Sequence, residues 1–135
     1  MRNLLLMLFI AISLISCASI ASMQSREAFD LSLEKYNQLV RWSEFDRAAL
    51  FSAASINEEF RERAKAARNV RITDYQVINV NYDEKAQEAS AVVTLSYYVL
   101  TSGIVNKVTD NQKWVHIDEG GVKAWRLKSL LPEFR

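Results

Sequence analysis

The sequence predicts a single α+β domain in which N-terminal helices pack on a curved antiparallel sheet of about four strands. Between residues 26 and 68, apolar residues recur at the three-and-four spacing of amphipathic helices. From Val70 onward they alternate with polar residues and are rich in Val, Ile and Tyr, which is typical of strands. Helices that precede an antiparallel sheet collect on one of its faces, and this gives the α+β class. The length of 135 residues suits one domain.

Three helices are expected. The first covers residues 26–42, the second residues 45–54 and the third residues 57–68. Ser43 is predicted as the N-cap of the second helix, because an acid follows it three residues later. The inward face of the first helix is predicted to comprise Phe29, Leu33, Tyr36 and Val40, widened by Leu39 and Trp42.

Four strands are expected to follow, at residues 70–82, 89–100, 104–118 and 122–130. Charged or glycine-containing turns separate them. A bulge is predicted in the third strand near Asp110 and Asn111. In the first strand, the apolar residues of one parity are Val70, Ile72, Ile78, Val80 and Tyr82.

The N-terminus has the pattern of a secretion signal. Arg2 is followed by an apolar run, Leu4 to Ile15, interrupted only by Ser13. This run of about 12 residues is well short of the roughly 20 that a membrane-spanning helix needs. A buried N-terminal helix is the alternative, but it would need a polar face, which this stretch does not have.

The run ends in Leu14-Ile15-Ser16-Cys17, which resembles the lipobox of bacterial lipoproteins. The resemblance implies that a signal peptidase recognises Leu14, Ile15 and Ser16, cuts before Cys17, and leaves diacylglycerol on the Cys17 thiol and an acyl chain such as palmitate on the new amino group. Several acyl chains hold a protein stably on a membrane. By the same resemblance, Ala18 after the cysteine favours the outer membrane facing the periplasm in a Gram-negative cell. An ordinary signal with an incidental cysteine, or a free cytosolic thiol, is the alternative.

The predicted organisation is therefore a signal peptide at 1–16, a lipidated tether at 17–25 and an α+β domain at 26–135. The tether is expected to be flexible because its small and polar residues show no periodicity.

The predicted domain resembles the nuclear transport factor 2-like superfamily, whose members have a cone-shaped α+β fold. The pattern extends over residues 25–131, and its most similar part is the final hairpin, with residues 113–117 and the Trp-containing strand at 120–127. A cystatin-like sheet over a helix is the alternative fold. The short or missing strand between the helices departs from several members of the superfamily.

The resemblance implies either a binding or interaction module or an enzyme of the ketosteroid isomerase or dehydratase type. For an enzyme, the catalytic candidates are His116, Asp118 and Asp74, because a histidine beside a carboxylate can act as a general base near neutral pH. In the simpler alternative, His116 lies on the polar outer side of the sheet, while Val115 and Ile117 face the core. The residues predicted to line a pocket or an interface are Tyr36, Tyr97, Tyr98, Trp114 and Trp125.

Composition excludes several other classes. The formal net charge of +1 is too small for a polybasic nucleic-acid binder. One Cys and one His cannot make a Cys/His zinc site, and no phosphate-binding glycine loop is present, so neither a metal nor a cofactor is expected. The sequence favours a lipid-anchored envelope protein without catalytic activity. Its expected partners are the membrane, an envelope protein, a small apolar ligand or a second copy paired through the sheet face.

Overall fold

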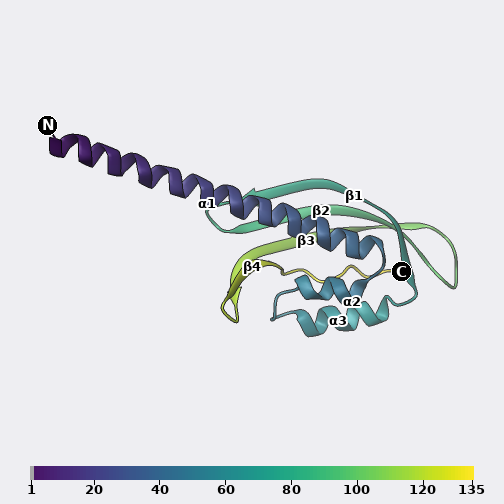
Figure 1. Cartoon of the computed structure of the whole chain (residues 1–135). Helices are drawn as coiled ribbons and strands as arrows, with labels where there is room; N and C mark the ends of the chain where they lie inside the picture. The colour runs from purple at the N-terminus through teal and green to yellow at the C-terminus, as the bar shows by residue number, and fades with distance from the viewer. Residues whose placement is uncertain (1) are drawn as a thin grey trace.

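Helices come first in the chain and an antiparallel sheet follows, which confirms the predicted α+β class (Figure 1). The computed structural model describes the backbone of residues 2–135 and the side chains of residues 19–135. The elements in chain order are α1 (Arg2–Arg41), α2 (Phe45–Ala48), the 3-10 helix η1 (Ala49–Phe51), α3 (Asn57–Ala66), β1 (Val70–Asp83), β2 (Glu88–Val99), β3 (Asn106–Glu119) and β4 (Val122–Leu127).

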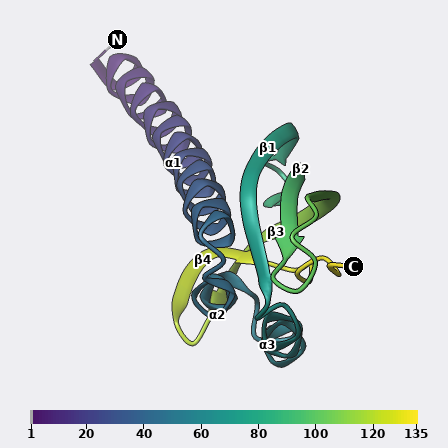
Figure 2. The same ribbon diagram turned by 90° about the vertical axis from the view of Figure 1, so that its right-hand side faces the viewer.

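The sheet is a four-strand meander in which each strand pairs antiparallel with the next. It curves beside α1, and α2 and α3 lie close to the C-terminal end of that helix (Figure 2). Alternate residues of β2, from Ala89 to Tyr97, are buried on the inner face. The first helix supplies the opposite layer of the core, and all four residues of its predicted stripe are buried there. The core forms because the apolar side chains of α1, which recur about every 3.6 residues, pack against the alternate side chains of the strands.

The strand irregularities lie in β1, not in β3. The register of β3 against β2 is continuous through Asp110 and Asn111, so the bulge predicted there is wrong. Two register shifts occur in β1 instead, between Ile72 and Asp74 and between Val77 and Asn79. Each shift adds one residue and reverses the parity of the strand. Ile78 therefore lies at a bulge and is 56% exposed, although its parity predicted an inward position.

Helix α1 is longer than predicted, because it includes residues 18–25, which were expected to be a flexible tether. This segment contains neither Gly nor Pro, so nothing in it terminates a helix that continues backwards from Arg26. The predicted signal and lipidation residues Leu14, Ile15, Ser16 and Cys17 lie outside the residues whose side chains are described. The division into signal peptide, tether and domain stays a prediction. Within the described residues, no helix has both the length and the apolar character that a membrane crossing needs.

The end of α1 also differs from the prediction. Trp42 does not widen the core stripe but is 71% exposed, with the Arg41 guanidinium 5.2 Å above its ring. Ser43 is not a helix cap, since it has a positive φ of 58° and its Oγ accepts a hydrogen bond from the backbone N–H of Ile72 at 3.0 Å. This bond joins the helical layer to the first residues of β1.

Candidate functional site

His116 lies on the inner face of β3, at the edge of the core. It pairs in register with Trp125, and the two rings stack at 5.0 Å. Since Trp125 is buried, His116 does not occupy the polar outer face that the simpler alternative predicted. Partial burial, followed by the positive charge of Lys123, lowers the pKa of His116, so its imidazole is neutral at pH 7.

The two predicted acids do not join His116 in one site. Asp118 is exposed, and its Oδ1 accepts a hydrogen bond from the N–H of Gly121 at 3.0 Å, which stabilises the tight turn before β4. Asp74 lies in register with Ser96 on the outer face of β1, and β2 separates that strand from β3. The catalytic set predicted from the sequence is therefore divided between a turn and the two faces of the sheet.

Most of the aromatic candidates form the core. Tyr36, Tyr97, Trp114 and Trp125 are all less than 5% exposed. Trp114 packs edge-on against Tyr36 at 5.6 Å, so these two rings fill the centre of the domain. Tyr98 is the exception, because it points to the outer face of β2 and is half-buried there.

A buried polar cluster lies beside these rings and includes three residues that the sequence analysis did not single out: Asn37, Asp110 and Gln112. Each is no more than 2% exposed. The Gln112 Nε2 donates to Asn37 Oδ1 and to Asp110 Oδ2, both at 2.9 Å. Trp114 Nε1 donates to Gln112 Oε1 at 3.3 Å. The cluster therefore ties α1 to β3 through a nearly complete set of hydrogen bonds.

Burial changes the acid–base properties of this cluster. Burial raises the pKa of Asp110 to about 7, and the hydrogen bond from Gln112 partly opposes this increase. Burial, and secondarily the Asp110 charge, raises the pKa of Tyr36 well above its ordinary value. The Tyr36 hydroxyl has no hydrogen-bond partner among the described residues. A carboxyl that titrates near neutral pH thus lies close enough to the Tyr36 hydroxyl for its charge to raise the pKa of that hydroxyl, and neither side chain is more than 2% exposed.

The sequence held a signal for this cluster. Asp110, Gln112 and Trp114 alternate in one strand, so an inward Trp114 places both polar residues inward as well. The predicted bulge at Asp110 obscured this alternation. Asn37 follows Tyr36 on the first helix. Its burial could not be predicted, because the sequence does not give the width of the buried face of that helix.

A second polar cluster joins α1 to the sheet where the helix reaches the domain. The carbonyl of Ser25 accepts a hydrogen bond from Trp125 Nε1 at 3.0 Å, and Ser25 Oγ accepts one from the Tyr82 hydroxyl at 3.2 Å. The Oε1 of Gln87 lies 2.8 Å from His116 Nδ1 and 3.4 Å from Ser25 Oγ. Because the Gln87 amide nitrogen donates to a backbone carbonyl, its oxygen must be the acceptor, and the His116 proton is therefore on Nδ1.

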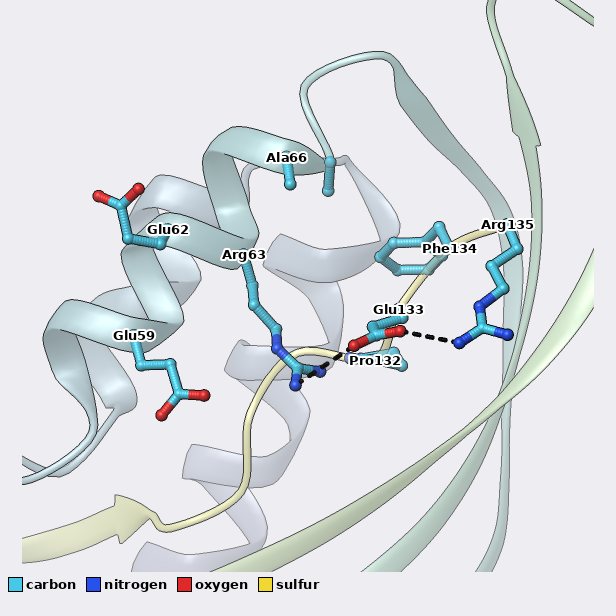
Figure 3. A pocket seen from close by; sticks show the side chains of 9 residues that line it. Glu59, Glu62, Arg63, Ala66, Pro132, Glu133, Phe134 and Arg135 are labelled. Carbon is cyan, nitrogen blue, oxygen red and sulfur yellow. Dashed lines mark hydrogen bonds and ion pairs between the residues drawn. The ribbon is translucent and has the colours of Figure 1, made fainter.

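Figure 3 shows a surface hollow of about 440 Å³ between α3 and the C-terminal tail. The two arginines of this hollow, Arg63 and Arg135, form hydrogen bonds or ion pairs with residues of the tail. Arg63 donates to the Leu131 carbonyl at 2.9 Å and lies 3.6 Å from Glu133, which also pairs with Arg135 at 3.1 Å. These contacts hold the tail against α3.

A second hollow, of about 490 Å³, lies between the end of α1 and the segment formed by α2 and η1. Trp42 and Leu50 line it and are 71% and 63% exposed, and the half-buried Leu39 and Phe51 line it too. The rest of the lining is polar or charged: Lys35, Gln38, Glu44 and Arg47. Exposed aromatic and aliphatic side chains around a hollow are typical of protein contact surfaces. Neither hollow is lined by Tyr36 or Asp110.

No family model and no curated protein matches the chain. In the part of the chain with described side chains, no group of three or more His, Cys, Asp or Glu residues is arranged to hold a metal ion. Function must therefore be inferred from the residues themselves.

Proposed function

We propose that this protein is a bacterial lipoprotein whose α+β domain acts as a binding module at the membrane surface. Signal peptidase cleavage before Cys17 and acylation of that residue would anchor it in the cell envelope, in the outer membrane facing the periplasm if the cell is Gram-negative. The support for the anchor is the sequence Leu14-Ile15-Ser16-Cys17 after a short apolar run.

One observation carries the choice of binding over catalysis: the centre of the domain is filled by its own side chains. Tyr36 and Trp114 are at most 1% exposed and pack against each other. The predicted catalytic residues are separated, as described above. A filled interior favours binding of partners at the surface, and the exposed hollow beside Trp42 and Leu50 is the best candidate for that contact.

The finer fold assignment also belongs to this proposal. A nuclear transport factor 2-like domain is favoured by a single parallel bridge between Ser52, which follows η1, and Leu127 on β4. The bridge is completed by a hydrogen bond from the N–H of Ala53 to the Leu127 carbonyl at 2.8 Å. It stands at the place of the short strand that several members of that superfamily have between their helices.

A second function is favoured by the pair of Asp110 and Tyr36. An acid whose pKa is about 7, near a tyrosine hydroxyl, can serve as the general acid–base pair of an isomerase or dehydratase. A substrate would have to open α1 away from β3. Titration with a conjugated enone steroid tests this: a change in the intrinsic tryptophan fluorescence that Asp110→Asn removes would support the enzyme, and no change would count against it.

Metabolic labelling with radioactive palmitate tests the anchor. We expect the label in the wild-type protein and none in Cys17→Ala, which should keep its uncleaved signal peptide. Ser16→Asp is a second variant. It keeps the Cys17 thiol but replaces the small residue before the cleavage site with a charged one, so unprocessed precursor should accumulate. Equal labelling of wild type and Cys17→Ala would refute lipidation at this residue.

A further inference from the structure

The apolar residues of α1 lie on a different face of the helix in the part that projects beyond the domain. From Phe29 to Val40 the apolar stripe faces the sheet and is buried. Four and seven residues before Phe29, the same face carries Ser25 and Ser22. The apolar residues of this part, Ile20 and Met23, lie on the opposite side of the helix and are 53% and 63% exposed.

The exposed stripe that begins with Ile20 and Met23 contains two chemically different parts. Its spacing of three and four residues continues through Glu27, Asp30 and Glu34, which are all exposed. No charged residue occurs between Cys17 and Ser25, and the first is Arg26, which pairs with Asp30 at 3.2 Å. The stripe is thus uncharged and apolar for two turns and acidic for the next two.

The position of Cys17 identifies what covers the apolar part. Residues 17 and 20 are one helical turn apart in α1. An acylated residue 17 would hold Ile20 and Met23 at a lipid surface. Residues 17–23 span about 9 Å of helix axis, which is less than the roughly 15 Å of hydrocarbon in one leaflet of a bilayer.

We infer that, in the lipidated protein, the first two turns of the mature helix insert into the membrane interface, with Ile20 and Met23 in the lipid and Glu27 and the residues beyond it in water. The inference rests on the proposed acylation of Cys17. The acidic part of the stripe stops the helix from lying flat, because Glu27, Asp30 and Glu34 would be repelled by an anionic bilayer. Since the cluster around Ser25 fixes α1 to the sheet immediately beyond this segment, the domain is held in one orientation above the membrane.

A depth measurement tests this inference. In the lipidated protein the only native thiol is blocked, so an introduced cysteine can be labelled alone. Met23→Cys and the control Leu31→Cys carry an environment-sensitive fluorophore on exposed positions of the outer side of α1. The full-length processed protein is reconstituted in vesicles of phosphatidylethanolamine and phosphatidylglycerol that contain a headgroup-proximal nitroxide lipid.

We expect a blue-shifted emission and strong nitroxide quenching at position 23, and the emission of an aqueous probe at position 31. Ile20→Glu in the Met23→Cys background should remove the shift while palmitate labelling persists. If palmitate is incorporated but positions 23 and 31 are equally aqueous, lipidation stands and the insertion is refuted. If no palmitate is incorporated, the proposed anchor fails and the insertion, which rests on it, fails as well.

Discussion

At the scale of single residues, Asp110 makes the folding stability depend on pH. Its pKa is about 7 in the folded protein against an ordinary value of 3.8. The folded state therefore binds more protons than the unfolded state between these values, and stability falls as pH rises from about 4 to about 7. Asp110→Asn removes the titrating group but keeps an oxygen that can accept the Gln112 hydrogen bond.

We expect urea unfolding to show that the wild type loses roughly 2–3 kcal/mol between pH 5 and pH 8 through this group, and that Asp110→Asn does not. The matched control is Asp74→Asn, an exposed acid whose replacement should leave the pH dependence intact. An equally steep loss of stability in Asp110→Asn would show that Asp110 is not the responsible carboxyl.

Two tyrosines of the core differ in what their hydroxyls do. The Tyr36 hydroxyl has no hydrogen-bond partner among residues 19–135, whereas the Tyr97 hydroxyl donates to the Arg135 carbonyl at 2.6 Å and accepts from the Arg135 N–H at 3.0 Å. A buried hydroxyl without a partner carries a desolvation cost. Tyr36→Phe should therefore leave stability unchanged or raise it by up to about 1 kcal/mol, while Tyr97→Phe should lower it by about 1–2 kcal/mol. Equal losses in the two variants, measured by denaturant unfolding, would mean that Tyr36 has a hidden partner.

At the scale of elements, the attachment of α1 depends on its first contact with the sheet. Trp125→Phe keeps a ring against Phe29 but removes the donor to the Ser25 carbonyl. We expect a loss of about 1 kcal/mol and faster amide hydrogen exchange in residues 22–29 than in residues 33–40. Ser25→Ala, which keeps the carbonyl bond, should give a smaller effect. Uniformly faster exchange along α1 would show that the Ser25 contact does not act locally.

The elements show how far the sequence alone could lead. Strand order, the helices-first arrangement and the core stripe of α1 followed from periodicity, because burial of one face leaves a direct trace in the sequence. The bulges of β1 left no such trace: Ile78 has the parity of a core residue, and only the pairing with β2 shows that an extra residue reverses it. The helical course of residues 18–25 was missed because serines replace the apolar stripe there.

The candidate site was predicted less well than the fold. His116 was recognised as unusual, yet its role as a partner of Gln87 and Trp125 depends on three-dimensional neighbours that spacing cannot give. Asp110 was overlooked because an inward carboxylate is unexpected in a strand. Its burial is tolerated because the raised pKa favours the neutral carboxyl and because Gln112 donates a hydrogen bond to it.

At the scale of the whole molecule, the proposed anchor and the candidate binding surface lie at opposite ends of α1. From residue 17 to Trp42 the helix axis rises about 37 Å, and Figure 1 shows its N-terminal part projecting beyond the sheet. A partner beside Trp42 and Leu50 would bind at a distance from the bilayer. Anchoring would raise the effective concentration of the domain for such a partner. This arrangement suits a module that presents one surface outward from a membrane.

The proposed membrane anchor is defined by the chemical state of residue 17. Mass spectrometry of the N-terminal peptide, taken from the protein purified out of the membrane fraction, measures that state directly. We expect a peptide that begins at Cys17 and carries the mass of diacylglycerol on its sulfur, together with an acyl chain on its amino group in most Gram-negative bacteria. A peptide that begins at Met1, or one that begins after a cut elsewhere with an unmodified Cys17, would contradict it.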